Sequence, residues 1–187
     1  MEQNELNHII RQCQQGNQKA FRMVMQEYQP MIFSLTLKML ADEQDAEDAL
    51  QDTFVLVWQN IQHYDPEKGK LSTWIYTIAS RICLDRLKRR KRTQPIADDE
   101  SVFRDFSENM NPEHKLVNTE WISFVRILAA QLSPKQQLVF TLRLLENVPI
   151  EEIETITQMT AEQIKSNLYV ARQKIIQQLK ALGYEQE

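Results

Sequence analysis

Glycine is scarce in this chain, and so are cysteine and histidine. Its 187 residues include 3 glycines, 2 cysteines and 3 histidines. The sequence has no phosphate-cradling glycine loop, and its histidines (His8, His63 and His114) are too scattered to form a metal cluster. Cys13 and Cys83 are too few for a disulfide scaffold and lack zinc-ligand spacing. We therefore expect no metal, no cofactor and no enzymatic activity, and a reducing compartment.

Long hydrophobic runs are also missing. The longest apolar-rich stretch, residues 31–40, is interrupted by Ser, Thr and Lys. It is much shorter than the ~20 residues that a membrane-spanning helix needs. No basic-then-apolar leader stands at the N-terminus. These features predict a cytoplasmic protein with no membrane insertion of its own.

Helical spacing of apolar residues dominates the first half of the chain, with no convincing alternating strand. Asn17 can cap a first helix, and Pro30 is expected to kink or break that helix because proline lacks the backbone N–H. Asp42 opens a second helix that continues to about Ile61, with acidic residues in its first turn. A loop containing proline and glycine follows, and a further helix is predicted over about residues 71–92.

The middle of the chain differs from both flanks. Residues 95–117 have no sustained period and contain two prolines and six acidic residues. Such a composition is typical of a mobile linker. We therefore predict an all-α fold of two small helical domains, residues 1–94 and 118–187, joined by an acidic, flexible linker.

Capping signals mark the helices of the second half. Ser133 with Gln136, and Thr160 with Gln163, each fit a capping box. A short helix starting at Pro149, a turn of about four residues and a longer helix would then form a helix-turn-helix. Periodicity alone leaves a plain αα-hairpin as the alternative.

A dense basic cluster interrupts an otherwise acidic chain. Seven of the twelve residues 81–92 are basic, although the formal net charge is −4. On a helix from residue 71, one stripe faces the core: Leu71, Ile75, Ile78 and Ile82. The adjacent face carries an indole and basic residues: Trp74, Thr77, Arg81, Lys88 and Arg92. Basic groups bind phosphates and aromatic rings stack on unpaired bases, so this face favours nucleic acid with some bases unstacked. The alternatives are core packing for Trp74 and a solvated helix end for the basic residues.

The second helix of the predicted helix-turn-helix would read duplex DNA. Its N-terminal part enters the major groove in such motifs. Gln163 and Asn167 have amides suited to adenine, and Lys165 suits guanine or a phosphate. The full predicted set is Thr160, Gln163, Lys165, Ser166, Asn167 and Arg172, whereas Leu168 and Ala171 face the core.

Several blocks, taken in order, resemble one family. These are "GNQKAF", "DAEDALQDTFVLVWQNI", "YDPEKGKLSTWIYTIASRICLDRLKRRKR" and "LSPKQQLVFTLRLLENVPIEEIETITQMTAEQIKSNLYVARQKI". Together they cover about residues 9–182 and resemble the sigma factors of bacterial RNA polymerase. The resemblance is to the two-domain group called extracytoplasmic-function (ECF, group IV) sigma factors. It implies a protein that binds core RNA polymerase and directs promoter recognition and DNA melting.

The resemblance also implies site residues. Core polymerase would be bound by Asp45, Glu47, Asp48, Gln51, Asp52, Phe54 and Trp58. The −10 element would be recognised and melted by Lys68, Lys70, Ser72, Thr73, Trp74, Thr77, Arg81, Lys88, Arg89 and Arg92. The helix from Thr160 would read the −35 element. Family members are commonly held inactive by a partner, so an anti-sigma factor is also expected.

The chain departs from the family pattern in the turn and in the second helix. Gln158 stands where the family usually has glycine, and Glu154 where it has a small residue. Asn167 and Val170 stand where many relatives have arginine, which predicts fewer phosphate contacts. Two other functions stay open: a free-standing regulator that binds duplex DNA without polymerase, and a helical protein that sequesters another factor.

Overall fold

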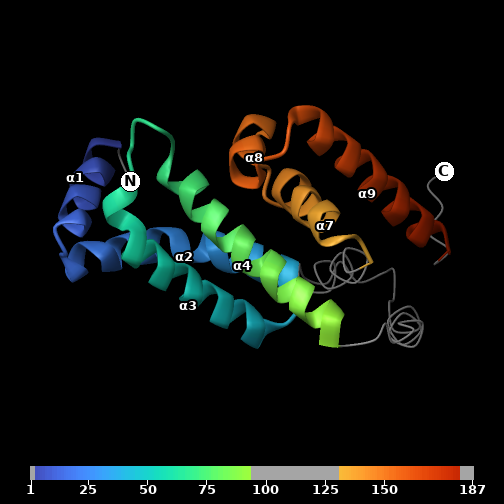
Figure 1. The fold of residues 1–187 in the computed structure, drawn as a ribbon, viewed down its shortest axis with the longest axis horizontal. Helices are drawn as coiled ribbons and strands as arrows, with labels where there is room; N and C mark the ends of the chain where they lie inside the picture. The colour runs from blue at the N-terminus through green and yellow to red at the C-terminus, as the bar shows by residue number, and fades with distance from the viewer. Residues whose placement is uncertain (1–2, 94–130, 182–187) are drawn as a thin grey trace, which may run out of the picture.

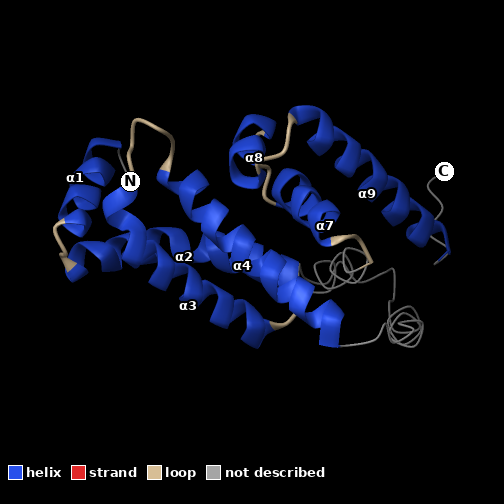
Figure 2. Cartoon of the chain, in the orientation of Figure 1, coloured by secondary structure: helices blue, strands red, loops and turns tan. Residues whose placement is uncertain are grey.

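The computed structural model describes residues 3–93 and 131–181, and every regular element in these two ranges is helical (Figure 2). The first domain contains α1 (Gln3–Gln14), α2 (Gln18–Leu40), α3 (Glu43–Asn60), the 3₁₀ turn η1 (Ile61–His63) and α4 (Leu71–Thr93). The second contains α7 (Pro134–Phe140), the π-helical segment η2 (Thr141–Leu145), α8 (Ile150–Thr157) and α9 (Ala161–Ala181). The all-α prediction is confirmed, and the predicted linker 95–117 lies outside the described residues.

Side-chain caps set the helix starts that the sequence predicts. The Asn17 side chain accepts hydrogen bonds from the backbone N–H groups of Lys19 and Ala20. The Asp42 carboxylate accepts from the Asp45 N–H at 2.8 Å. Ser133 heads a complete capping box with proline at the first helical turn. Each cap satisfies N–H groups that have no partner within the helix.

Pro30 does not break its helix, so the expected break does not occur. The helix α2 is continuous from Gln18 to Leu40. Pro30 lies on the exposed side, where the backbone carbonyl that loses its N–H partner can bind water instead. On the opposite side, Val24, Ile32 and Leu35 are fully buried. Their packing holds the helix together across the proline.

Helices α2, α3 and α4 pack on one another, and α1 packs on α2 at one end (Figure 1). Sequence periodicity did not predict α1. Its Leu6, Ile9 and Ile10 are buried, and the Gln14 amide donates hydrogen bonds to the carbonyls of Ile61 and Tyr64. These contacts fix the first residue of η1 and the start of the loop that leads into α4.

The two domains share one hydrophobic core. Helix α4 contacts α7 and α8, and α2 contacts η2. The buried cluster runs continuously from first-domain residues such as Ile75 to second-domain residues such as Leu142 and Ile153. Figure 1 shows α7 and α8 beside α4, with α9 packed on their far side. The second domain therefore rests on the helix that carries the predicted DNA-binding face.

Candidate nucleic-acid interface and polymerase-docking surface

The predicted basic face of α4 lies partly at the surface. Arg81, Lys88 and Arg89 are exposed, whereas Trp74 and Thr77 are half-buried. The side chain of Arg92 lies outside the described part of the chain. Lys88 forms an ion pair with Asp85 at 3.4 Å, as the spacing on the helix predicts. The residues of this face that the structure describes therefore present positive charge along the C-terminal half of α4.

Trp74 belongs to an aromatic pair beside the loop before α4. Its ring centroid is 5.3 Å from that of Tyr64, and the rings are tilted by 43°. The Tyr64 hydroxyl donates to the Gly69 carbonyl at 2.8 Å. Because this pair joins the loop to the first turns of α4, one side of the indole is supported by the core. The half-buried position leaves part of the ring for a stacking partner.

The remaining residues predicted to contact the −10 element lie beside Trp74, and two of them are already engaged. Lys68 and Lys70 are exposed, Ser72 is half-buried and Thr73 is buried. The Glu152 carboxylate on α8 accepts hydrogen bonds from Lys70 and from the Thr73 hydroxyl, both at 2.7 Å. The bond from Lys70 lowers the pKa of Glu152 below its ordinary value, and the bond from Thr73 acts in the same direction.

The acidic helix α3 presents a face away from the second domain. Glu47, Gln51 and Asp52 are exposed, and Asp45 and Asp48 are half-buried. The sequence did not single out Val55, which is 53% exposed and shares this face with Gln51 and Asp52. An exposed apolar residue among acids is what a basic partner with an apolar centre would bind.

The two predicted aromatic anchors of α3 point inward. The Phe54 side chain is buried, with its ring 6.3 Å from that of Phe21. Trp58 is half-buried, with its ring 4.8 Å from Phe21. As a direct contact to a partner, Phe54 is therefore disfavoured, and it supports the α3 surface from below.

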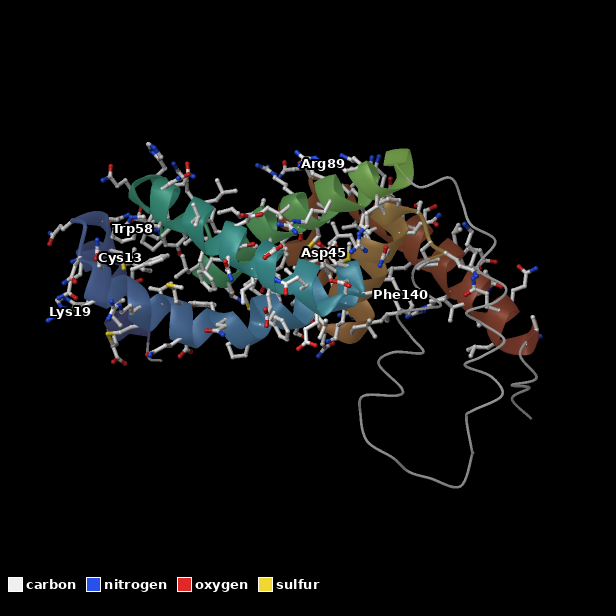
Figure 3. All side chains as sticks on the ribbon, turned by 90° about the horizontal axis from the view of Figure 1, so that it is seen from below. Cys13, Lys19, Asp45, Trp58, Arg89 and Phe140 are labelled. Carbon is white, nitrogen blue, oxygen red and sulfur yellow. The ribbon has the colours of Figure 1, made fainter. Side chains whose placement is uncertain are left out.

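Arginines of α4 bind the acids of α3 within the same domain. Arg90 donates to the Asp45 carboxylate and to the Leu40 carbonyl, and Arg86 pairs with Asp52 at 2.6 Å. Figure 3 shows Asp45 and Arg89 at the same end of the domain, far from Trp58. Part of the basic cluster thus stabilises α3 against α4, a role that the sequence analysis missed.

The helix-turn-helix forms as predicted. Helix α8 ends at Thr157, three residues form the turn, and α9 begins at Ala161. Thr160 and Gln163 make the reciprocal bonds of a capping box, at 3.1 and 3.3 Å. Leu168 and Ala171 are buried, as expected for the core side of α9.

The predicted −35 readers lie on the outer side of α9. Thr160, Gln163, Lys165, Ser166 and Arg172 are exposed, and Asn167 is half-buried. The Gln163 amide oxygen accepts from Thr160, and the Asn167 amide donates to the Gln163 carbonyl at 2.8 Å. Both amides therefore make bonds within the helix, and base contacts would compete with these bonds.

The two departures in the turn are accommodated. Gln158 adopts the left-handed conformation (φ 59°) that glycine favours, and its N–H donates to the Glu154 carbonyl at 2.8 Å. Glu154 reaches across the turn, and its carboxylate accepts from the Ala161 N–H at 2.7 Å. A carboxylate near a helix N-terminus also interacts favourably with the positive end of the helix dipole. Glu154 thus fastens α8 to the first turn of α9.

Replacing Glu154 with alanine should destabilise the second domain by about 1 kcal/mol, the typical value of an N-terminal capping bond. The free energy of unfolding, measured with urea on the full chain, checks this. The replacement Glu162→Ala is the matched control, because Glu162 is an exposed acid in the first turn of α9, next to the Ala161 N–H that Glu154 binds. Equal losses in the two variants would mean that the bond across the turn contributes nothing.

Both cysteines are free and buried. Burial raises the pKa of Cys13 to about 11 and that of Cys83 to about 12. Their thiols therefore stay protonated at neutral pH and act as small core side chains. No helix in the described ranges is long and apolar enough to cross a membrane.

Comparisons with known proteins agree with this arrangement of elements. Sigma-70 region 2 matches residues 24–93, which include all of α3 and α4. Sigma-70 region 4 matches residues 128–175, which include the helix-turn-helix. A chain with these two modules in this order is an RNA polymerase sigma factor, a protein that initiates transcription.

Relatives over the full length narrow the class. The chain is 26% identical to the ECF RNA polymerase sigma factor SigW of Bacillus subtilis, over 92% of this chain and 96% of the relative. It is 25% identical to the RNA polymerase sigma-H factor of Pseudomonas aeruginosa, over 96% of each. The protein belongs to the ECF sigma factors.

Solved structures support the fold. The fold is similar to that of CnrH, solved in complex with the cytosolic domain of CnrY, with a TM-score of 0.68 and 17% identity over 92% of this chain and 96% of that one. It is also similar to the sigma factor RpoE of Bartonella quintana, solved with the anti-sigma factor NepR, with a TM-score of 0.64 and 16% identity over 90% and 99%.

Proposed function

We propose that this sigma factor, a group IV member, binds core RNA polymerase through α3 and melts the −10 element with α4. The single observation that carries the proposal is the composition of α4. Its N-terminal half holds the half-buried Trp74, and its C-terminal half holds exposed Arg81, Lys88 and Arg89. An unpaired base on the indole, with phosphates on the basic residues, would be held more tightly than a paired base. Binding would therefore shift the opening equilibrium.

The docking surface on α3 comprises the exposed and half-buried acids with Val55. It faces away from the second domain, since α3 packs mainly on α2, α4 and η1. We propose a basic helical partner on core polymerase, with Asp48, Gln51 and Asp52 as the contacts. Asp52 would then exchange its ion pair with Arg86 for one with the partner, so the loss of the internal pair reduces the net gain from this contact.

The second domain is proposed to read the −35 element with α9. Lys165, Ser166 and Arg172 are exposed on its outer side. The proposed boundaries are residues 1–94 for the first domain, 95–117 for the linker and 118–187 for the second domain. Promoter DNA and core polymerase are the proposed partners, in the cytoplasm where transcription takes place.

An anti-sigma factor is a further proposed partner. The two similar folds described above were solved with a CnrY domain and with the anti-sigma factor NepR, respectively. The faces that such a partner would cover are the α3 docking surface and the basic half of α4.

Transcription by purified core polymerase tests the proposal. The template is fragmented DNA from the source organism, with and without this protein. We expect initiation at discrete sites only when the protein is present. If core polymerase gains nothing while the protein alone binds duplex DNA, the chain acts as a free-standing regulator. If neither occurs and another factor is bound instead, it acts by sequestration.

A further inference from the structure

The second domain touches the predicted DNA-binding region through Glu152. This residue lies in the first turn of α8 and binds Lys70 and Thr73, which precede and follow the start of α4. An ammonium and a hydroxyl are also the donors that a DNA phosphate would use. The carboxylate therefore occupies donors that the proposed function assigns to the −10 strand.

A second carboxylate anchors the same contact at a more buried position. Glu146 follows η2 and accepts from Lys38 at 2.6 Å and from Ser34 at 2.8 Å, both on α2. The Tyr76 hydroxyl of α4 lies 3.4 Å from its other oxygen. The side chains of Lys38 and Glu146 are 17% and 10% exposed, so this ion pair is screened little by water. Glu146 thus ties η2 to two helices of the first domain.

Uncharged polar and apolar contacts also join the two domains, beside the two carboxylates. The buried Gln137 amide of α7 donates to the Met39 carbonyl at 2.9 Å, near the end of α2. Val139, Leu142 and Ile153 join the core of the first domain. The contact is therefore a packed interface with specific polar ties, and α8 covers the N-terminal half of α4 (Figure 1).

We propose that the second domain is an autoinhibitory cover, in which Glu152 takes the DNA donors of α4 and Glu146 anchors the closed state. This inference rests on the proposed function of Lys70 and Thr73. DNA and Glu152 compete for the same two donors, so the second domain must leave α4 before the −10 strand is captured. The docking face of α3 remains exposed in the closed state. Polymerase could therefore dock before the second domain moves and DNA is captured.

The cover reduces the apparent affinity for DNA by the fraction of chains that are open. Neutralising an exposed ion pair such as Lys70–Glu152 should shift the opening equilibrium about two- to fivefold. Neutralising the more buried Glu146 should shift it about tenfold or more, since hydrogen bonds to charged groups contribute more. By linkage, DNA that binds the open state must also open the chain.

The test uses the full chain with Glu152→Gln, Glu146→Gln and the control Glu151→Gln. Glu151 is an exposed acid next to Glu152, so the control removes the same charge without the interdomain bonds. Small-angle X-ray scattering measures the radius of gyration, and fluorescence anisotropy measures binding of a labelled random-sequence 20-nucleotide single-stranded DNA. Circular dichroism checks that each variant is folded.

We expect both test variants to expand the chain and to bind the DNA more tightly, Glu146→Gln most, while Glu151→Gln matches the wild type. Unchanged radii in both test variants would overturn the role of the two carboxylates in holding the chain closed. Expanded radii with unchanged DNA affinity would overturn its inhibitory role. Failure of the transcription assay for every variant would overturn the proposed function instead, because the scattering result does not depend on it.

Discussion

Replacing Trp74 with alanine is expected to reduce promoter opening about tenfold or more while weakening initial promoter binding far less. Stacking of a base on an aromatic side chain contributes about 1–3 kcal/mol, and an unpaired base is present only after melting. The basic residues of α4 remain in the variant, so the phosphate contacts of the closed promoter complex persist. Permanganate reactivity of unpaired thymines reports opening, and retention of DNA by the polymerase complex reports initial binding.

The control for this experiment is Trp74→Phe. Phenylalanine keeps a flat ring that can stack on a base and on Tyr64, which lies 5.3 Å from the indole. We expect the variant to open promoters at a level between the wild type and Trp74→Ala. Equal loss of binding and opening in Trp74→Ala would contradict a melting role. The indole would then act through its packing on Tyr64 and the core.

Local features of the sequence predicted most of the helix boundaries. Asn17, Asp42, Ser133 and Thr160 are caps whose bonds reach only two or three residues along the chain. Such bonds depend on residue type and spacing alone. Pro30 is the exception, because its effect depends on burial, which a single helix does not define.

Contacts between distant residues could not be predicted in the same way. Glu146 and Glu152 are ordinary acids in the sequence, and their partners are 70 or more residues away. Glu154 looked unsuitable for a tight turn, yet it bonds to Ala161. Phe54 was a predicted docking residue through the family resemblance, and its burial against Phe21 is a contact between distant residues that the sequence does not reveal.

The resemblance to a family added what local features lacked. It named α3 and α4 as functional surfaces, and both helices lie within residues 24–93, which match sigma-70 region 2. It did not indicate which basic residues of α4 bind α3 and which face solvent. Arg86 and Arg90 hold α3, whereas Arg81 and Lys88 face outward. This division depends on the angle between two packed helices.

Replacing Ile75 with alanine is expected to lower the free energy of unfolding by about 2–5 kcal/mol, the usual cost of truncating a buried aliphatic side chain. Ile75 is 0% exposed and lies at the centre of the shared core. The replacement leaves a cavity between α4 and its neighbours, because a packed core relaxes only partly. Urea unfolding of the full chain measures the change.

Ile78→Ala is the matched control, since the sequence places Ile75 and Ile78 in one core-facing stripe but the structure leaves Ile78 half-buried. The same chemical change should therefore cost clearly less there, because part of the removed surface already contacts water. Equal costs would mean that both residues contribute equally to the core, as the single predicted stripe implies, despite their different burial. The difference matters for the proposed function, because the orientation of α4 that buries Ile75 also leaves Arg81 and Lys88 exposed to solvent, where the proposed DNA phosphates would bind.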